Sequence, residues 1–224
     1  INLIYKILSK ADVFIQNLAP GATNKVGLDS EKLRKLYPKL ITCDISGYGE
    51  QGPYKDMKAY DFLIQCETGL ASITGGPNEP SRVGVSLCDI AAGMYATQAI
   101  YLALLNRKLT GVGESLKVSL FDSLADWMSV PLLLSDYTNE APTRVGLNHP
   151  GIAPYGAYNT LDNKQIVISI QNEREWAIFC SSILKNKSLS KNKKFLSNEK
   201  RVSNRVELNL TINKIFNNTK SEVM

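Results

Sequence analysis

Two short apolar runs near the start of the chain constrain its fold most strongly. Asp12–Gln16 and Leu40–Ser46 have the length and the apolar content of buried strands, and each is followed by a turn. Between them, Asp29 is a good N-cap for a helix that Pro38 ends. Successive strand–turn–helix units pack as a parallel sheet covered by helices, with ligands beyond the carboxyl ends of the strands. The sequence therefore predicts an α/β domain.

The rest of the chain continues this pattern and then changes it. A third strand is expected at Ser115–Ser119, and a hairpin is expected around Asp162-Asn163. The other expected elements are a helix at Tyr60–Gly69, a short strand at Val83–Leu87, a long apolar helix from Asp89 through about Leu105, and helices from near Phe121, Glu173 and Asn204. We predict that residues 1–130 belong to a large α/β domain, that residues 131–150 form a proline-punctuated linker, and that residues 151–224 form a smaller α+β domain.

Hydropathy and charge narrow the classes of partner. The chain has 224 residues, of which 44% are apolar, but no run of roughly 18 uninterrupted apolar residues that would span a membrane. Much of the net charge of +5 lies between Lys185 and Arg205, where aromatic side chains for base stacking are scarce. We therefore expect a soluble protein that binds neither membranes nor nucleic acids.

The cysteines and the single histidine argue against a metal centre. The four cysteines, at positions 43, 66, 88 and 180, are widely spaced and form no CxxC pair. Thiols of this kind act as small apolar packing groups in a reducing compartment. We expect a cytoplasmic protein with no metal, no disulfide framework and no bound cofactor.

The ends of the chain indicate a fragment. Residue 1 is Ile rather than Met, and no signal-peptide pattern opens the sequence. Lys214–Met224 resembles an amphipathic helix that stops in mid-course. We expect a parent protein that continues beyond both ends.

Asp89 is the sharpest candidate for chemistry. It is a lone carboxylate between an expected strand and an apolar helix. One interpretation is an N-cap, which contributes about 0.5–2 kcal/mol to a helix. The other is a covalent nucleophile, because a carboxylate near free helix N–H groups is held ionised and can attack an activated acyl group. The local pattern leaves both interpretations open.

Two further segments combine turn residues with polar groups. The glycines of Gly47–Pro53 leave backbone N–H groups uncovered, as a bound carboxylate or oxyanion would require. A plain tight turn would contain the same glycines. Lys58–Asp61 places a cation, a phenol and a carboxylate before a helix, and a solvated surface with a helix cap also explains that combination.

Taken in order, these motifs resemble those of the family III coenzyme A transferases, the CaiB/BaiF group that contains formyl-CoA transferase and the carnitine-CoA transferases. The matching segments are Ala11–Asn17 with Pro20-Gly21, Gly27–Asp29, Ile45–Gly49 with Gly52-Pro53, Ala59–Asp61 with Gln65, Thr74-Gly75, Val83-Gly84, Asp89–Gly93, Arg107 with Thr110-Gly111 and Gly113, and Val118–Asp122. Each motif alone is weak, and their joint order and spacing carry the resemblance.

The resemblance implies an enzyme that transfers coenzyme A (CoA) from an acyl-CoA thioester to an acceptor carboxylic acid. In this mechanism Asp89 attacks the thioester to give an aspartyl–acyl anhydride, and the CoA thiolate then forms an aspartyl-CoA thioester. The implied fold is a Rossmann-like parallel-sheet domain, here without its N-terminal part, linked to a smaller α+β domain. The implied assembly is a homodimer with interlocked subunits, which a linker at Pro131–Pro150 would accommodate.

Site residues follow from the same resemblance. Two segments are implied to contact CoA, namely Asn17, Leu18 and Ala19 with Lys25, and Lys58, Ala59, Tyr60 and Asp61. Gly47, Gly49 and Gly52 are implied candidates for stabilising the intermediates. His149 either lines the acyl site or is a turn residue before Pro150.

The acyl groups and two alternative functions complete the prediction. Members that act on short dicarboxylic acids, such as mesaconyl-, itaconyl-, citramalyl- or succinyl-CoA, are the ones most resembled by three segments of the chain, Cys43–Gly49, Ile152–Gly156 and Gln171–Trp176.

A racemase of the same fold is one alternative function. It pairs its aspartate with a histidine where this chain has Tyr60, and a phenol with a pKa of about 10 is a poor base at neutral pH. An inactive CoA-binding fragment is the other.

Overall fold

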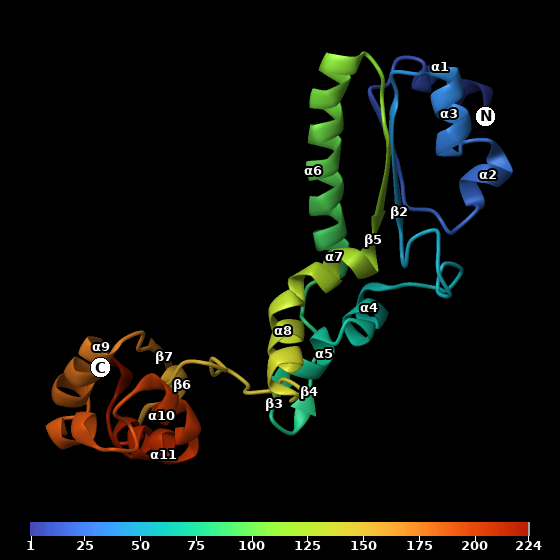
Figure 1. Ribbon diagram of the computed structural model, residues 1–224. Coiled ribbons are helices and arrows are strands. Elements are labelled where there is room, and N and C mark those ends of the chain that lie inside the picture. Colours follow the sequence, from blue (N-terminus) through green and yellow to red (C-terminus); the bar gives the residue numbers. More distant parts are fainter. Residues whose placement is uncertain (224) are drawn as a thin grey trace. The chain divides into compact units, whose positions relative to one another are not determined.

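The structure, a computed structural model, describes residues 1–223 (Figure 1). The chain forms two compact units. The first comprises Ile1–Thr74 and Ser81–Pro142, and the second comprises Gly75–Pro80 and the chain from Thr143 onward.

A three-stranded parallel sheet forms the centre of the first unit. Its strands are β1 (Val13–Gln16), β2 (Ile41–Ser46) and β5 (Ser115–Ser119), in the order β1-β2-β5. Residues 41–44 of the middle strand are all buried, as expected for a strand covered on both faces. The predicted α/β class and the parallel sheet are therefore confirmed.

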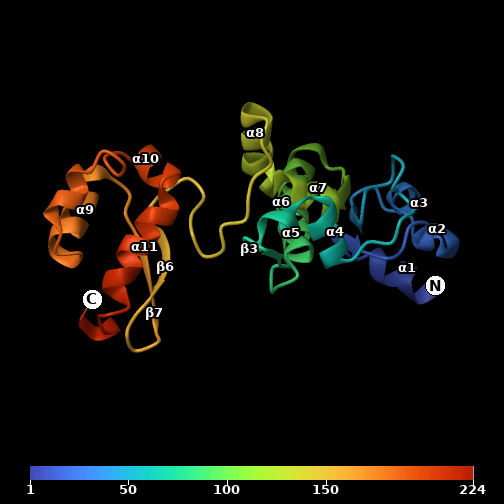
Figure 2. The same cartoon turned by 90° about the horizontal axis from the view of Figure 1, so that it is seen from below.

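Helices cover both faces of this sheet. The helices of the first unit are α1 (Asn2–Leu8), α2 (Ala22–Val26), α3 (Ser30–Leu36), α4 (Asp61–Glu67), α5 (Leu70–Ile73), α6 (Leu87–Thr110), α7 (Leu120–Trp127) and α8 (Ser129–Thr138). Helix α6 lies on one face and α3 on the other, as seen in Figure 1 and again from below in Figure 2. The predicted cap of α3 is confirmed, because the Asp29 carboxylate accepts a hydrogen bond from the Lys32 backbone N–H at 2.9 Å.

The short strand predicted at Val83–Leu87 is wrong. This segment is irregular, and α6 begins at Leu87 after Ser86 as N-cap. The Val83 N–H donates to the Gln65 side chain at 2.9 Å, so that it has a partner without a neighbouring strand. Asp89 is consequently the third residue of the helix and not its cap.

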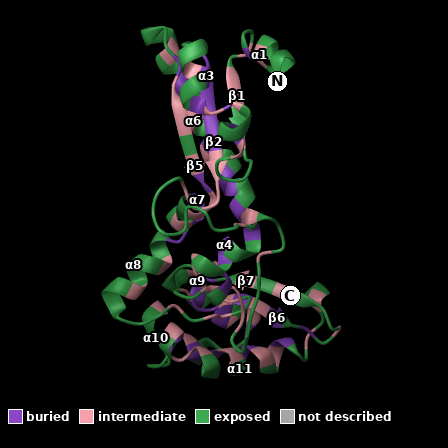
Figure 3. Cartoon of the chain, turned by 90° about the vertical axis from the view of Figure 1, so that its right-hand side faces the viewer, coloured by how far each residue is buried: buried purple, intermediate pink, exposed green. Residues whose placement is uncertain are grey.

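Part of the stretch predicted as a linker is helical. Helix α8 contains Pro131 as its third residue, in the first helical turn, where a proline removes no intrahelical hydrogen bond. The chain passes from the first unit to the second after Pro142. None of the residues of α8 is buried in this structure, although the helix is rich in leucine (Figure 3).

Helix α6 combines a buried face of small residues with exposed large ones. Ala91, Ala92, Ala96 and Ala103 are buried, which allows the helix to pack closely on neighbouring elements. By length and composition alone α6 is able to cross a membrane, with a mean hydropathy of 1.3 in its most apolar window, of which 28% is buried. One such helix is weak evidence for a membrane span, because core helices of soluble proteins pass the same test.

The second unit is built from hairpins and helices. The short strands β3 (Gly75–Gly76) and β4 (Glu79–Pro80) pair, as do β6 (Tyr155–Asn159) and β7 (Gln165–Ser169), which confirms the predicted hairpin. The helices are α9 (Glu173–Ile178), α10 (Asn198–Ser203) and α11 (Arg205–Phe216), with shorter helical turns at Phe179–Ile183, Lys187–Lys191 and Ser221–Val223. Aromatic and aliphatic side chains from the hairpin and the helices form a separate core in this unit.

Candidate functional site

A cavity of about 460 Å³ opens at the carboxyl ends of β1 and β2. The chain that follows β1, the start of α3 and the turn after β2 contribute to its lining. Ligands of parallel α/β sheets bind at this end of the strands. The cavity is therefore in the place where the sequence predicts a ligand.

A buried carboxylate organises one wall of this cavity. Asp44 is only 9% exposed, and its carboxylate accepts hydrogen bonds from the Gln16 amide at 2.8 Å and the Ser30 hydroxyl at 2.6 Å. Gln16 in turn accepts a hydrogen bond from the Leu18 backbone N–H at 2.8 Å. The sequence analysis did not identify Asp44 as a site residue, although a charged residue inside the apolar strand Leu40–Ser46 was a usable signal.

The segment predicted to contact CoA after β1 lies partly at this cavity. Leu18 and Ala19 line it, whereas Asn17 and Lys25 are not among its lining residues. Lys25 lies in α2 with an exposed side chain. Two neighbours of Lys25, Thr23 and Asn24, do line the cavity.

The glycine turn after β2 packs directly against the Lys58–Asp61 segment. A Cβ atom at Gly47 would lie 2.2 Å from the Cβ of Ala59, so that only glycine permits this approach. Gly49 lines the cavity, and its N–H donates to the Ser46 hydroxyl at 3.1 Å. Gly52 is exposed and has a positive φ of 84°. The backbone N–H of Gly49 is thus already hydrogen-bonded within the protein.

Asp89 projects from the first turn of α6 and is exposed. Burial raises the pKa of its carboxyl group, and the nearby charge of Asp61 raises that pKa further. An acid in the first helical turn interacts favourably with the helix dipole. The residue is therefore an accessible carboxylate with increased basicity.

Asp61 has a different environment from Asp89. It is 9% exposed, and its two carboxylate oxygens accept hydrogen bonds from the Cys88 backbone N–H and the Gln65 side-chain amide, both at 2.9 Å. The guanidinium of Arg82 lies 3.6 Å from the same carboxylate. The other members of the segment, Lys58 and Tyr60, are exposed.

The thiol next to Asp89 is shielded. Cys88 is fully buried, and its Sγ donates to the Asp61 backbone carbonyl at 3.2 Å. Burial, with a smaller effect of the Asp61 charge, raises the pKa of the Cys88 thiol to about 12. At neutral pH this thiol is protonated, and it is therefore a poor nucleophile.

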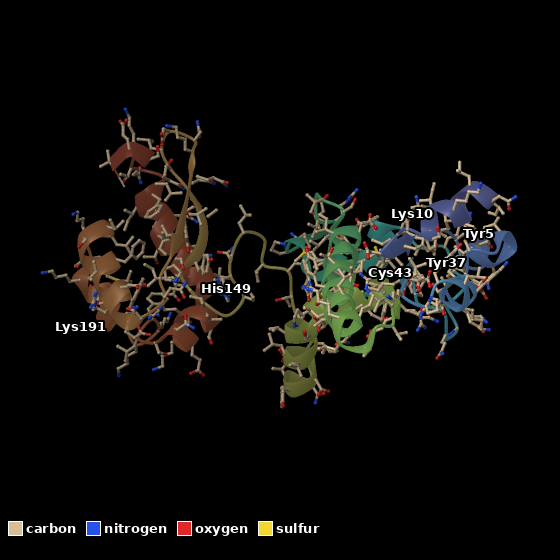
Figure 4. All side chains as sticks on the ribbon, turned by 90° about the horizontal axis from the view of Figure 1, so that it is seen from above. Tyr5, Lys10, Tyr37, Cys43, His149 and Lys191 are labelled. Atoms are coloured by element: carbon tan, nitrogen blue, oxygen red, sulfur yellow. The ribbon has the colours of Figure 1, made fainter. Side chains whose placement is uncertain are left out.

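His149 belongs to the second unit, where Figure 4 labels it. Its ring stacks on Tyr155 with centroids 5.2 Å apart, and its Nδ1 accepts a hydrogen bond from the Gly151 N–H at 3.1 Å. The backbone carbonyl of His149 accepts a hydrogen bond from Arg205 at 2.7 Å. These contacts order the turn before Pro150 within its own unit.

The candidate residues of the first unit are thus partly brought together. Leu18, Ala19 and Gly49 meet at the cavity, and Asp61 meets the start of α6. Asp89 is not among the residues that line the cavity. Within residues 1–223, no group of three or more His, Cys, Asp or Glu side chains is placed to hold a metal ion.

Comparison with known proteins gives consistent matches. The sequence model of CoA-transferase family III matches residues 1–224. A succinate–glutarate CoA-transferase of Agrobacterium fabrum is 34% identical over 180 residues, which are 80% of this chain and 45% of that protein. An acetyl-CoA:oxalate CoA-transferase of Acetobacter aceti is 34% identical over 183 residues, which are 81% of this chain and 47% of that protein.

Human succinyl-CoA:glutarate CoA-transferase is 33% identical over 183 residues, which are 80% of this chain and 41% of that protein. The chain therefore spans less than half the length of each of these three relatives.

Solved structures match over nearly the whole chain. A CaiB/BaiF family protein from Brucella suis has a TM-score of 0.84 and 34% identity, and the match covers 99% of this chain and 58% of that one. A hypothetical protein from Mycobacterium tuberculosis has a TM-score of 0.85 at 24% identity, over 99% of this chain and 59% of that one, which shows a shared fold.

Proposed function

The chain belongs to CoA-transferase family III, and from that membership we propose that its parent protein transfers CoA from an acyl-CoA thioester to a carboxylic acid. The observation that carries the proposal is the placement of Asp89. It is an exposed carboxylate of raised pKa in the first turn of α6, with a protonated thiol beside it.

Short dicarboxylic acids are the proposed substrates. The matched relatives from Agrobacterium and human are named for succinate and glutarate, and the relative from Acetobacter is named for oxalate. Identity of about one third across four fifths of this chain supports the same substrate class here. Succinyl-CoA as donor with glutarate or oxalate as acceptor is therefore the first pair to test.

We propose that transfer proceeds through two kinds of covalent intermediate on Asp89. Its carboxylate oxygen attacks the thioester carbonyl carbon, and the CoA thiolate leaves, which gives an aspartyl–acyl anhydride. The thiolate then attacks the aspartyl carbonyl and expels the donor acid, which leaves an aspartyl-CoA thioester. The acceptor carboxylate attacks this thioester to form a second anhydride. The released thiolate attacks the acceptor acyl carbon, which regenerates the Asp89 carboxylate.

This route needs no oxidant and no external energy source. Anhydride and thioester are both activated acyl groups, so each attack exchanges one for the other. A more basic carboxylate is the stronger nucleophile, provided that it stays ionised at the working pH. The direction in which burial and Asp61 shift the pKa of Asp89 thus favours attack.

CoA recognition is proposed for the two segments that the family resemblance indicates. Leu18 and Ala19 line the cavity beyond β1, and Asn17 and Lys25 lie on the same connection. The other segment comprises Lys58, Ala59, Tyr60 and Asp61. Its Lys58 and Tyr60 are exposed, whereas both carboxylate oxygens of Asp61 already accept hydrogen bonds within the protein. A Lys ammonium is a suitable point charge for a CoA phosphate.

The turn with Gly47, Gly49 and Gly52 remains the proposed stabiliser of the intermediates, in which the Gly49 N–H would exchange its present acceptor, the Ser46 hydroxyl, for the intermediate. For His149 two roles stand as proposals, lining of the acyl site and ordering of the turn before Pro150, and its contacts with Tyr155, Gly151 and Arg205 support the second. The resemblance supports a cytoplasmic, interlocked homodimer without metal or bound cofactor as the working form of the parent protein.

Trapping of the intermediate tests the mechanism. The complete gene product is incubated with succinyl-CoA and hydroxylamine, and its peptides are examined by mass spectrometry. We expect a hydroxamate, or chain cleavage, at Asp89, and neither product in the Asp89→Asn variant. That variant should lose transfer while its dissociation constant for CoA stays within about threefold, because the carboxylate is not needed to hold the nucleotide. Continued turnover by Asp89→Asn, or a modification on another residue, would refute the mechanism.

A further inference from the structure

Two side chains of α4 accept hydrogen bonds from the backbone at and just before the start of α6. Asp61 and Gln65 are one helical turn apart, and the Gln65 amide nitrogen donates to the Asp61 carboxylate at 2.9 Å. Asp61 also accepts the Cys88 backbone N–H at 2.9 Å, and the Gln65 amide oxygen accepts the Val83 backbone N–H at 2.9 Å. Asp61 is 9% exposed and Gln65 is fully buried. The irregular segment before Asp89 is thus held at both of its ends by one pair of side chains.

Neighbouring contacts also hold the Val83–Cys88 segment in place. The Cys88 thiol donates to the Asp61 backbone carbonyl at 3.2 Å. Ile64 of α4, Cys88 of α6 and Leu124 of α7 form one buried apolar cluster beside these hydrogen bonds. Polar and apolar contacts therefore both fix the residue that immediately precedes Asp89.

We propose that Asp61 and Gln65 are positioning residues for the Asp89 nucleophile: they hold the Val83–Cys88 segment so that the Asp89 carboxylate projects in the geometry that attack requires. This inference rests on the proposed function of Asp89. It assigns to Gln65 a role in transfer, and it gives the Asp61 carboxylate a task other than contact with CoA. We call the hydrogen bonds that Asp61 and Gln65 make to each other and to the backbone of Cys88 and Val83 the anchor. Small displacements of a reacting group cost roughly 100-fold in rate, so the loss of this anchor would lower kcat.

The donor and acceptor pattern of the pair permits a charge exchange as the test. In Gln65→Glu two carboxylates face each other. In Asp61→Asn only one oxygen remains at position 61, and the Gln65 side-chain N–H and the Cys88 backbone N–H compete for it. In the double variant Asp61→Asn/Gln65→Glu, the new amide at 61 donates to the new carboxylate at 65. The oxygen at 61 still accepts the Cys88 N–H, and a carboxylate oxygen at 65 still accepts the Val83 N–H. Every hydrogen bond of the anchor is restored with the charge moved by one helical turn.

We expect each single variant of the complete gene product to lower kcat roughly 10- to 100-fold, with KM for the acyl-CoA within about twofold. The double variant should recover kcat to within about threefold of the wild type. Gln98→Glu, the same exchange at an exposed position of α6, is the matched control and should change neither constant. A residue that only stabilised the fold would change the midpoint of thermal unfolding without this separation of kcat from KM.

The proposal is overturned if the single variants keep kcat, if their loss lies in KM, or if the double variant does not recover turnover, including the case in which it does not fold. The parallel Asp89→Asn variant separates the two hypotheses. Retained transfer in Asp89→Asn would remove the proposed function itself. Lost transfer and lost hydroxamate in Asp89→Asn, together with unaffected charge-exchange variants, would remove only the positioning role.

Discussion

The carboxylates of Asp61 and Asp89, both near the start of α6, differ in their exposure and in their hydrogen bonding. Asp61 is buried, and both of its oxygens accept hydrogen bonds from the protein, which suits a residue that fixes geometry. Asp89 is exposed and has a raised pKa, which suits a residue that reacts. Pairs of acids whose surroundings give them separate roles are a recurring feature of active sites.

The pH dependence of transfer follows from this pair. Asp89 must be ionised to attack, and its pKa lies above the ordinary value of 3.8 because of burial and then because of Asp61. Activity should therefore fall as pH decreases through this raised pKa. In Asp61→Asn the repulsive charge is gone, so the acidic limb of kcat/KM should move to lower pH even if the maximum is reduced. A pH profile of both proteins checks this, and an unmoved or upward-moved limb would contradict it.

Among the elements, helix α6 connects the sheet to the candidate nucleophile. Its first turn carries Asp89, and its last turn carries Arg107, which bonds to the N-terminal side of the sheet. The Arg107 guanidinium donates to the Lys39 carbonyl at 3.0 Å and to the Asp12 carboxylate at 2.7 Å. One guanidinium therefore links the chain before β1 to the chain before β2, as the fork geometry of arginine allows.

Removal of this link should destabilise the first unit. Arg107→Met deletes charge-assisted hydrogen bonds to a carbonyl and to a carboxylate, and we expect a loss of about 1–3 kcal/mol in the free energy of unfolding. Lys108→Met at the adjacent, exposed position is the control and should change stability by less than about 0.5 kcal/mol. Urea denaturation followed by circular dichroism measures both, and equal effects of the two variants would show that Arg107 makes no special contribution.

At the scale of the whole molecule, each unit has its own apolar core. The clusters around Leu33 and Ile64 lie in the first unit, and the cluster around Trp176 lies in the second. The second unit also buries Arg201 completely. Its guanidinium donates to the Ala153 carbonyl at 2.7 Å, pairs with Glu173 at 2.6 Å and lies 5.1 Å from the centre of the Trp176 ring.

Arg201→Met should unfold the second unit selectively. The substitution leaves the carbonyls of Ala153 and Phe195 without the donors that Arg201 supplies, and a buried acceptor left unsatisfied costs about 1–3 kcal/mol. Fluorescence of Trp176 in a Trp127→Phe background reports on the second unit, and fluorescence of Trp127 in a Trp176→Phe background reports on the first. We expect the midpoint to fall for the Trp176 signal and to stay unchanged for the Trp127 signal. A parallel shift of both would show that the units do not unfold separately.

Local pattern was sufficient for the parts of the fold that depend on neighbours in sequence. The parallel strands, the Asp29 cap and the β6–β7 hairpin were predictable because alternation, turn residues and capping act over a few residues. The strand predicted at Val83–Leu87 failed for the opposite reason. Its apolar residues fit a strand, but its backbone N–H at Val83 bonds to a side chain of another helix.

The order of motifs along the chain by itself determined the family and singled out position 89 as the reactive candidate. Only the tertiary structure decided that Asp61, 27 residues before Cys88, bonds to the backbone next to that position. It also decided that Asp44 joins Gln16 and Ser30 at the cavity and that Arg201 is buried. The physical reason is that a buried polar group must find a partner wherever packing places one. That partner is set by the three-dimensional arrangement and not by spacing in the sequence.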